Sequence, residues 1–303
     1  MVCEGHKINE SERFTWNFRE AHRGRAVNLF SRLQHWRTQR QLRRRRIPAQ
    51  LWRQVTETAL GHYRLTAREL QRLRNLASLF LQQKIINGAG GQEVDDTMRA
   101  VIAAQACLLI LNLDLDWFGG WREIIVYPGS FVVDRIDHED PGAAGLGVVH
   151  EQRAVLDGEA WGRGPVILAW DDARPDAHRH GEAFNVILHE FAHKLDMLNG
   201  TANGMPPLHP GMDQQRWTRV FTRAFDRLHA QIEQQQLGSI DPYGAEDPGE
   251  FFAVATEAFF QTPRQLYREC PDVYTQLAQF YRQDPRQRGT GCDYPDGDSS
   301  DAG

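Results

Sequence analysis

Residues 185–200 read Asn-Val-Ile-Leu-His-Glu-Phe-Ala-His-Lys-Leu-Asp-Met-Leu-Asn-Gly and contain the pattern His-Glu-x-x-His. On an α-helix, His189 and His193 lie on one face about one turn apart, so both imidazoles can reach one metal ion. A zinc ion held in this way lowers the pKa of its bound water, and the neighbouring carboxylate of Glu190 can accept the proton. The pattern therefore predicts a hydrolytic zinc site on this helix.

The residues around the motif are mostly apolar, among them Ile187, Leu188, Phe191 and Leu195. A helix that is apolar on most of its sides is expected to be buried. Two imidazoles and a carboxylate on a buried helix need partners, because unpaired polar groups are costly there. A bound metal ion would satisfy them together, which makes the metal interpretation stronger than a chance occurrence of the motif on a surface helix.

A catalytic zinc site needs a third protein ligand. The metzincin pattern would place Gly at 196 and His at 199, but this chain has Asp196 and Asn199, so that class is excluded. Asp196 shares a helix face with both histidines, but it lies too far along the axis to bind the same ion. We expect Asp196 to orient one of the imidazoles. A surface acid at the end of the helix explains this residue equally well.

The third ligand is expected on a second apolar helix that begins near Pro248. Asp247 suits the N-cap and Pro248 the first helical position, so Glu250 could simply complete a capping box. The phenylalanines that follow, however, predict a buried helix. Glu250 and Glu257 share one face of it, and buried acids need a cation or a hydrogen-bond donor. Periodicity alone leaves these two glutamates as competing ligands.

Segments 188–196 and 247–254 together resemble the Mlc titration factor A family of zinc-dependent peptidases. The similarity runs in order and without large gaps from about residue 50 to 288. It includes the segments Phe80–Lys84, Ile125–Pro128, Phe131–Asp134, Gly164–Leu168 and Gln279–Pro285. The resemblance implies a gluzincin-type site that holds one Zn²⁺ ion per chain.

The resemblance also implies the roles of individual residues. The three zinc ligands of the family fall on His189, His193 and Glu250. The general base falls on Glu190. The active-site tyrosine, seven residues before the ligand glutamate, falls on Tyr243, whose phenol can hydrogen-bond a developing oxyanion. Glu257 then becomes a candidate for orienting a ligand.

Two functions follow from this resemblance. The first is a zinc metallopeptidase, aminopeptidase-like in action, with peptides or proteins as substrates. The second is a mainly non-catalytic regulator that binds and sequesters an Mlc-like transcriptional repressor of sugar uptake. No short motif marks the residues of such a protein interaction, so the sequence leaves both functions open.

A short apolar run precedes the zinc helix and predicts a β-strand made of Val166, Ile167, Leu168, Ala169 and Trp170. In zinc peptidases of this type, an edge strand at this place pairs with the substrate backbone. We therefore expect residues 166–170 to bind substrate, although an ordinary buried strand would show the same pattern.

The rest of the chain predicts an α+β, zincin-like fold. Helical patterns fill residues 48–115, with a capping box at Thr66–Glu69, and strands are expected at 123–127, 131–134 and 148–155. The expected order is a helical N-terminal part, a small mixed sheet, the zinc helix and a helical C-terminal part. We expect three regions: a basic, partly disordered arm (1–47), the metallopeptidase domain (48–288) and a disordered tail (289–303).

Composition excludes several other classes of protein. The 303 residues are 41% hydrophobic with a net charge of −5, which supports a substantial core and predicts no direct nucleic-acid binding. The first 25 residues lack an apolar signal-peptide core, and the longest apolar run, 101–113, is too short to cross a bilayer. The four cysteines show no Cys-x-x-Cys spacing. We expect a cytoplasmic protein with free thiols and without stable membrane insertion.

Overall fold

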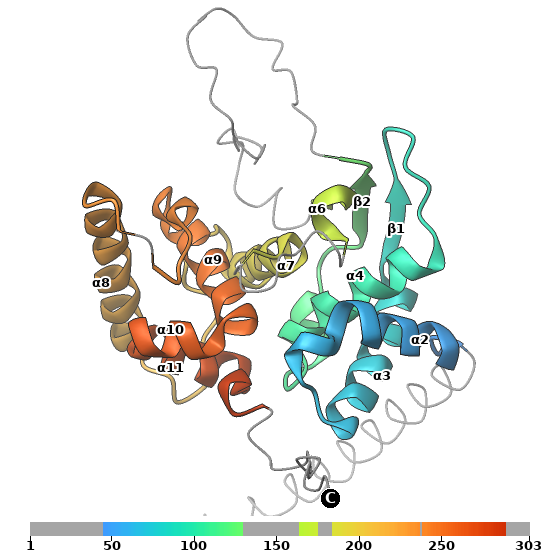
Figure 1. Cartoon of the computed structure of the whole chain (residues 1–303), viewed down its shortest axis with the longest axis horizontal. Coiled ribbons are helices and arrows are strands. Elements are labelled where there is room, and N and C mark those ends of the chain that lie inside the picture. Colours follow the sequence, from blue (N-terminus) through green and yellow to red (C-terminus); the bar gives the residue numbers. More distant parts are fainter. Residues whose placement is uncertain (1–44, 130–163, 175–183, 237, 289–303) are drawn as a thin grey trace, which may run out of the picture. The chain divides into compact units, whose positions relative to one another are not determined.

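A computed structural model describes residues 45–129, 164–174, 184–236 and 238–288 (Figure 1). All the elements named below belong to one compact unit, Ile47–Gly303. Most of the predicted basic arm, the predicted strands at 131–134 and 148–155 and the predicted tail lie outside the described residues.

The described N-terminal part is mostly helical, as predicted, but residues 85–88 within the stretch expected to be helical form a β-strand. Its α-helices are α2 (Ala49–Val55), α3 (Ala67–Gln83) and α4 (Asp96–Leu109). The predicted capping box opens α3, because the Thr66 hydroxyl accepts the Glu69 N–H and the Glu69 carboxylate accepts the Thr66 N–H. Helix α4 is buried from Ala100 to its end and packs against α2, α3 and α7. It therefore forms the centre of the hydrophobic core.

Three short strands form one sheet in the order β1-β2-β3. They are β1 (Ile85–Gly88), β2 (Glu123–Tyr127) and β3 (Val166–Ala169). Both pairings are parallel, with Ile86 beside Ile124 and Val126 beside Leu168. The prediction of a mixed sheet is therefore wrong for the described strands. Helix α4 lies between β1 and β2 in the chain and provides the crossover that a parallel pair requires.

Strand β3 ends one residue earlier than predicted. Trp170 begins the short helix α6 (Trp170–Ala173), in which Asp171 and Asp172 occupy the first turn. Acidic side chains are favourable there because a helix N-terminus carries partial positive charge. In the described part of the chain, β3 pairs with β2 on one side and with no strand on the other. Among these residues no strand blocks the predicted pairing of β3 with substrate.

The C-terminal part is made of helices. They are α7 (Val186–Asp196), α8 (Gln214–Glu233), α9 (Pro248–Gln261), α10 (Pro263–Glu269) and α11 (Pro271–Tyr281). Helix α7 packs against α9 on one side and against α4 and β3 on the other (Figure 1). Helix α7 thus has neighbours from both the N-terminal and the C-terminal part of the chain, and both can reach its side chains.

The described residues bear on two expectations, the lack of a membrane-spanning helix and the presence of free thiols. None of the described helices combines the length and apolarity that crossing a bilayer demands. Cys107 and Cys270 are both free thiols, as predicted.

Candidate metal centre

Helix α7 presents the His-Glu-x-x-His motif from inside the protein. Asn185 caps the helix, because its side-chain oxygen accepts the Leu188 N–H at 3.0 Å. Ten of the eleven residues of α7 are buried, and the exception is Glu190. The predicted burial of this helix is confirmed, and the one side chain left accessible is the carboxylate next to His189.

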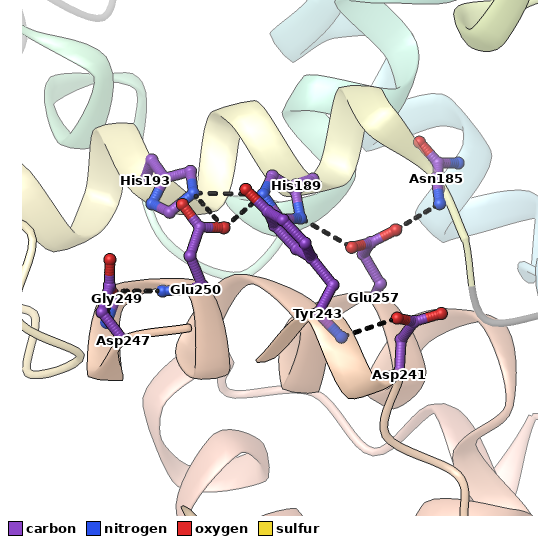
Figure 2. Close-up of polar contacts among 9 residues, drawn as sticks. All are labelled: Asn185, His189, His193, Asp241, Tyr243, Asp247, Gly249, Glu250 and Glu257. Atoms are coloured by element: carbon purple, nitrogen blue, oxygen red, sulfur yellow. Dashed lines mark hydrogen bonds and ion pairs between the residues drawn. The ribbon is translucent and has the colours of Figure 1, made fainter. Parts of the chain in front are cut away.

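Helix α9 faces α7 and brings a carboxylate to the two histidines. Asp247 caps α9 by accepting the N–H groups of Gly249 and Glu250 at 2.7 and 3.0 Å. The Glu250 side chain does not turn back to the cap but points across to α7 (Figure 2). The capping-box alternative for Glu250 is therefore not what the structure shows.

Three ligand atoms converge between these helices (Figure 2). Nε2 of His189 and Nε2 of His193 are 3.1 Å apart, and Oε2 of Glu250 lies 3.0 and 3.3 Å from them. A tetrahedral zinc site with metal–ligand distances of about 2.0–2.2 Å would have edges of about 3.3–3.6 Å. Two imidazole nitrogens and one carboxylate oxygen also match the donors that zinc prefers. The residues present therefore fit a bound zinc ion.

Glu257 has a different place in the site from Glu250. Nδ1 of His189 donates to Oε1 of Glu257 at 2.7 Å, and Oε2 of Glu257 accepts the backbone N–H of Asn185. A proton on Nδ1 leaves the lone pair of Nε2 directed toward Glu250 and His193, as a metal ligand requires. Glu257 thus orients His189 from behind, while Glu250 faces the shared point.

The charges of the site favour a cation. Burial alone would lower the pKa of His189, but its hydrogen bonds to Glu250 and Glu257 outweigh burial and raise the pKa to about 10. Burial would raise the pKa of Glu250, but hydrogen bonds with both histidines hold it well below its usual range. The two carboxylates that contact the buried imidazole of His189 therefore favour its protonated, positively charged form. A divalent ion at the same place would supply positive charge instead of that proton. Metal binding would release the ring proton.

Sequence reasoning missed the part played by Asn185. Its side-chain NH₂ donates to Oε1 of Gln105 at 3.0 Å and reaches the Tyr63 hydroxyl at 3.3 Å, while its backbone N–H holds Glu257. All these groups are buried. Asn185 therefore ties the start of α7 to α4, α9 and the segment that precedes α3. An asparagine just before an apolar helical run was the only signal, and it indicates a cap rather than a partner of Glu257.

Asp196 contacts a loop. Its Oδ2 accepts the N–H of Gly204 at 2.7 Å, and burial raises the pKa of its carboxyl to about 7. Gly204 has φ +75°, and a Cβ there would lie 2.3 Å from the Pro248 carbonyl oxygen, so only glycine fits. The described hydrogen bond of Asp196 goes to this loop rather than to an imidazole, so the expectation that Asp196 orients an imidazole is not what the structure shows. The bond fastens the loop to the end of α7.

Tyr243 lies next to the metal ligands. It belongs to the 3₁₀ turn η6 (Pro242–Ala245), where the capping Asp241 accepts its N–H at 2.8 Å. Its half-buried ring lies 6.0 Å, centroid to centroid, from the ring of His189, and its hydroxyl points toward the two imidazoles (Figure 2). The structure thus brings together the predicted ligands, the predicted tyrosine and, on α7, the predicted base.

A His-Glu-x-x-His helix that supplies two imidazoles, completed by a glutamate from a later helix, defines a metallopeptidase-type centre. Comparison with known proteins agrees with this class. The model of the family described as glucose-regulated metallo-peptidase M90 matches residues 33–282, and the chain therefore belongs to that family.

Relatives of this chain carry the name Mlc titration factor A, which confirms the predicted family. The relative from Salmonella arizonae is 42% identical over 226 residues, which cover 74% of this chain and 87% of the relative. The relative from Salmonella typhi is 41% identical over 74% of this chain and 83% of its own length. The Salmonella typhimurium relative gives the same three figures as that from Salmonella typhi.

Proposed function

We propose that this protein is a zinc-dependent peptidase that removes residues from the free amino ends of peptides or proteins. The observation that carries the proposal is the convergence of His189, His193 and Glu250 beside the accessible carboxylate of Glu190. The family membership supports the peptidase class.

The chain would hold the metal with His189, His193 and Glu250. When bound there, zinc acts as a Lewis acid toward the scissile carbonyl and lowers the pKa of water. Glu257 keeps the proton of His189 on Nδ1, so that Nε2 stays available as a ligand. Because these groups are buried between α7 and α9, their geometry is set before substrate arrives.

Two further side chains would act on the substrate. Glu190 takes the proton of the attacking water and delivers it to the leaving amine, for which its exposure beside His189 suits it. Tyr243 donates a hydrogen bond to the oxygen that gains charge as the carbonyl is attacked. Its hydroxyl is directed to this region by the 3₁₀ turn that precedes α9.

Strand β3 is the proposed place for the substrate backbone. In the described residues its outer side has no paired strand, so its N–H and C=O groups are available for an extended peptide. The strand packs against α7, which places such a peptide near the zinc helix. Backbone pairing binds many sequences, so this arrangement supports a broad preference for side chains.

A set of matched peptides tests the proposal. We expect the zinc-loaded protein to cleave peptides with a free amino end and to leave the same sequences uncut when that end is acetylated. Cleavage products are identified by mass spectrometry, and protein stripped of metal with a chelator serves as the control. Equal cleavage of blocked peptides would contradict the aminopeptidase part alone, whereas no cleavage of either set would contradict the peptidase function.

The second candidate is a regulator that sequesters a transcriptional repressor. It is supported by the name of the relatives, Mlc titration factor A, which are 41–42% identical to this chain. An intact metal centre does not separate the two functions, because a binding protein can keep one. This candidate would be favoured if the protein binds an Mlc-like repressor equally well before and after its metal is removed.

A further inference from the structure

A hollow of about 340 Å³ has none of the metal ligands in its lining. Its walls come from η3 (Gly61–Tyr63) and the residue after it, the end of α9, helix α10 and the turn η7 (Pro285–Gln287) with the residue after it. Four arginines line it, namely Arg64, Arg264, Arg268 and Arg288, and no aspartate or glutamate does. We propose that this arginine pocket binds a small phosphate-class anion.

The charge of the pocket is the first argument. Arg64, Arg264 and Arg268 are exposed, and within the described part of the chain none of them has a carboxylate partner. Like charges gathered in one hollow repel one another unless an anion lies between them. The chain as a whole carries a net charge of −5, so this concentration of positive charge does not reflect the general composition.

Arg288 is the second and independent argument. Its side chain is only 8% exposed, and its Nη2 donates to Glu69 and Gln283 at 3.1 and 2.8 Å. Nη1 is buried too, and among the described residues it has no hydrogen-bond partner. A buried donor without an acceptor is costly, especially on a charged group. Glu69 and Gln283 fix this guanidinium at the wall of the pocket, so an anion bound there would lie beside a positive group that keeps an unsatisfied donor.

The chemistry of the lining selects the class of ligand. Guanidinium groups bind phosphate oxygens through paired N–H donors, and a tetrahedral dianion can accept from several of them at once. A hollow of about 340 Å³ lies at the small end of ordinary ligand sites. Inorganic phosphate or the phosphate group of a small metabolite therefore fits the pocket.

The acidic C-terminal residues of the chain are an alternative occupant of the arginine pocket. The chain continues from Arg288 into residues 289–303, which contain four aspartates and neither lysine nor arginine. The carboxylates of this tail could compete for the same guanidinium groups. A variant in which Asp293, Asp296, Asp298 and Asp301 are replaced by asparagine keeps the full chain and removes that competition.

Isothermal titration of the zinc-loaded full chain with inorganic phosphate tests the proposal at constant ionic strength. We expect one phosphate per chain. Arg264→Gln with Arg268→Gln should weaken binding at least about tenfold, because two charge-assisted hydrogen-bonding groups are lost. Both arginines are exposed on α10, so the fold should be retained. The matched control is Arg216→Gln with Arg219→Gln on α8, which removes the same charge and should leave binding unchanged.

Three results would overturn the proposal. The first is absence of binding in the millimolar range. The second is a phosphate affinity that falls equally in the α10 and α8 double variants, or that changes in neither of them. Phosphate would then bind at the metal centre or on the general surface. The third is binding that appears only after the four aspartates are neutralised, since the pocket would then belong to the chain's own tail.

Discussion

Replacing Glu190 with glutamine should lower the rate of peptide hydrolysis by about 10²–10⁴-fold and leave the zinc content unchanged. Glutamine has the shape of glutamate but cannot accept the proton of the attacking water. Glu190 is the one residue of α7 that is not buried, so the exchange should not disturb the packing of the helix. The measurements are kcat on an unblocked peptide and zinc per chain by elemental analysis.

A matched control for this variant is Glu233→Gln, because Glu233 is an exposed glutamate near the end of α8. The control should keep full activity and full zinc content. Undiminished hydrolysis by the Glu190→Gln variant would remove the proposed proton transfer from the account. Loss of both activity and zinc would instead show that Glu190 supports the metal site.

The same variant distinguishes the two candidate functions. A protein that acts only by sequestering a repressor needs no proton transfer, so Glu190→Gln should leave its regulatory effect intact. A protein that acts through hydrolysis should lose that effect together with kcat.

Exchanging Glu250 for glutamine should weaken zinc binding more than any change outside the ligand set. The variant keeps the volume of the side chain but replaces a charged oxygen ligand, at 3.0 and 3.3 Å from the two imidazole nitrogens, by a neutral amide. Glu257→Gln should weaken zinc binding by only about 10–100-fold, the range found for groups that orient a ligand. Competition with a fluorescent zinc chelator measures both affinities.

This comparison tests the different roles given to the two glutamates. Both oxygens of Glu257 accept a hydrogen bond, so an amide there must leave one donor unmatched, but the ligand set itself stays complete. Thermal unfolding of each metal-free variant controls for loss of the fold. A larger loss of affinity for Glu257→Gln than for Glu250→Gln would reverse the assignment.

The sequence predicts the parts of this site that depend on local rules. Two histidines one helical turn apart must share a face, and a buried helix follows from the apolar residues around them. The capping residues Asp247 and Thr66 were recognisable for the same reason, since a cap depends on neighbours three residues away.

The sequence alone could not separate Glu250 from Glu257, because they share one face of α9. What separates them is which nitrogen of His189 each meets, Nε2 or Nδ1, and that depends on how α9 lies against α7. The resemblance to a family resolved the choice, and the geometry agrees with it. For Asp196 the spacing alone was misleading. It suggested an imidazole as the partner, but in the folded protein the Asp196 carboxylate accepts the N–H of Gly204 from a loop.

The sheet shows a second limit of sequence reasoning. Strand β1 has four residues, of which only Ile86 is buried, so it carries no alternation to recognise. Parallel pairing with β2 arises from the path of the chain through α4, which no local pattern in either strand records.

The most direct test of the metal centre is a crystal structure of the zinc-loaded protein with anomalous data recorded on both sides of the zinc absorption edge. We expect one strong anomalous peak about 2.0–2.2 Å from Nε2 of His189, Nε2 of His193 and a carboxylate oxygen of Glu250, with a further position open to solvent. A peak elsewhere, or one at this place coordinated by Glu257 in place of Glu250, would contradict it.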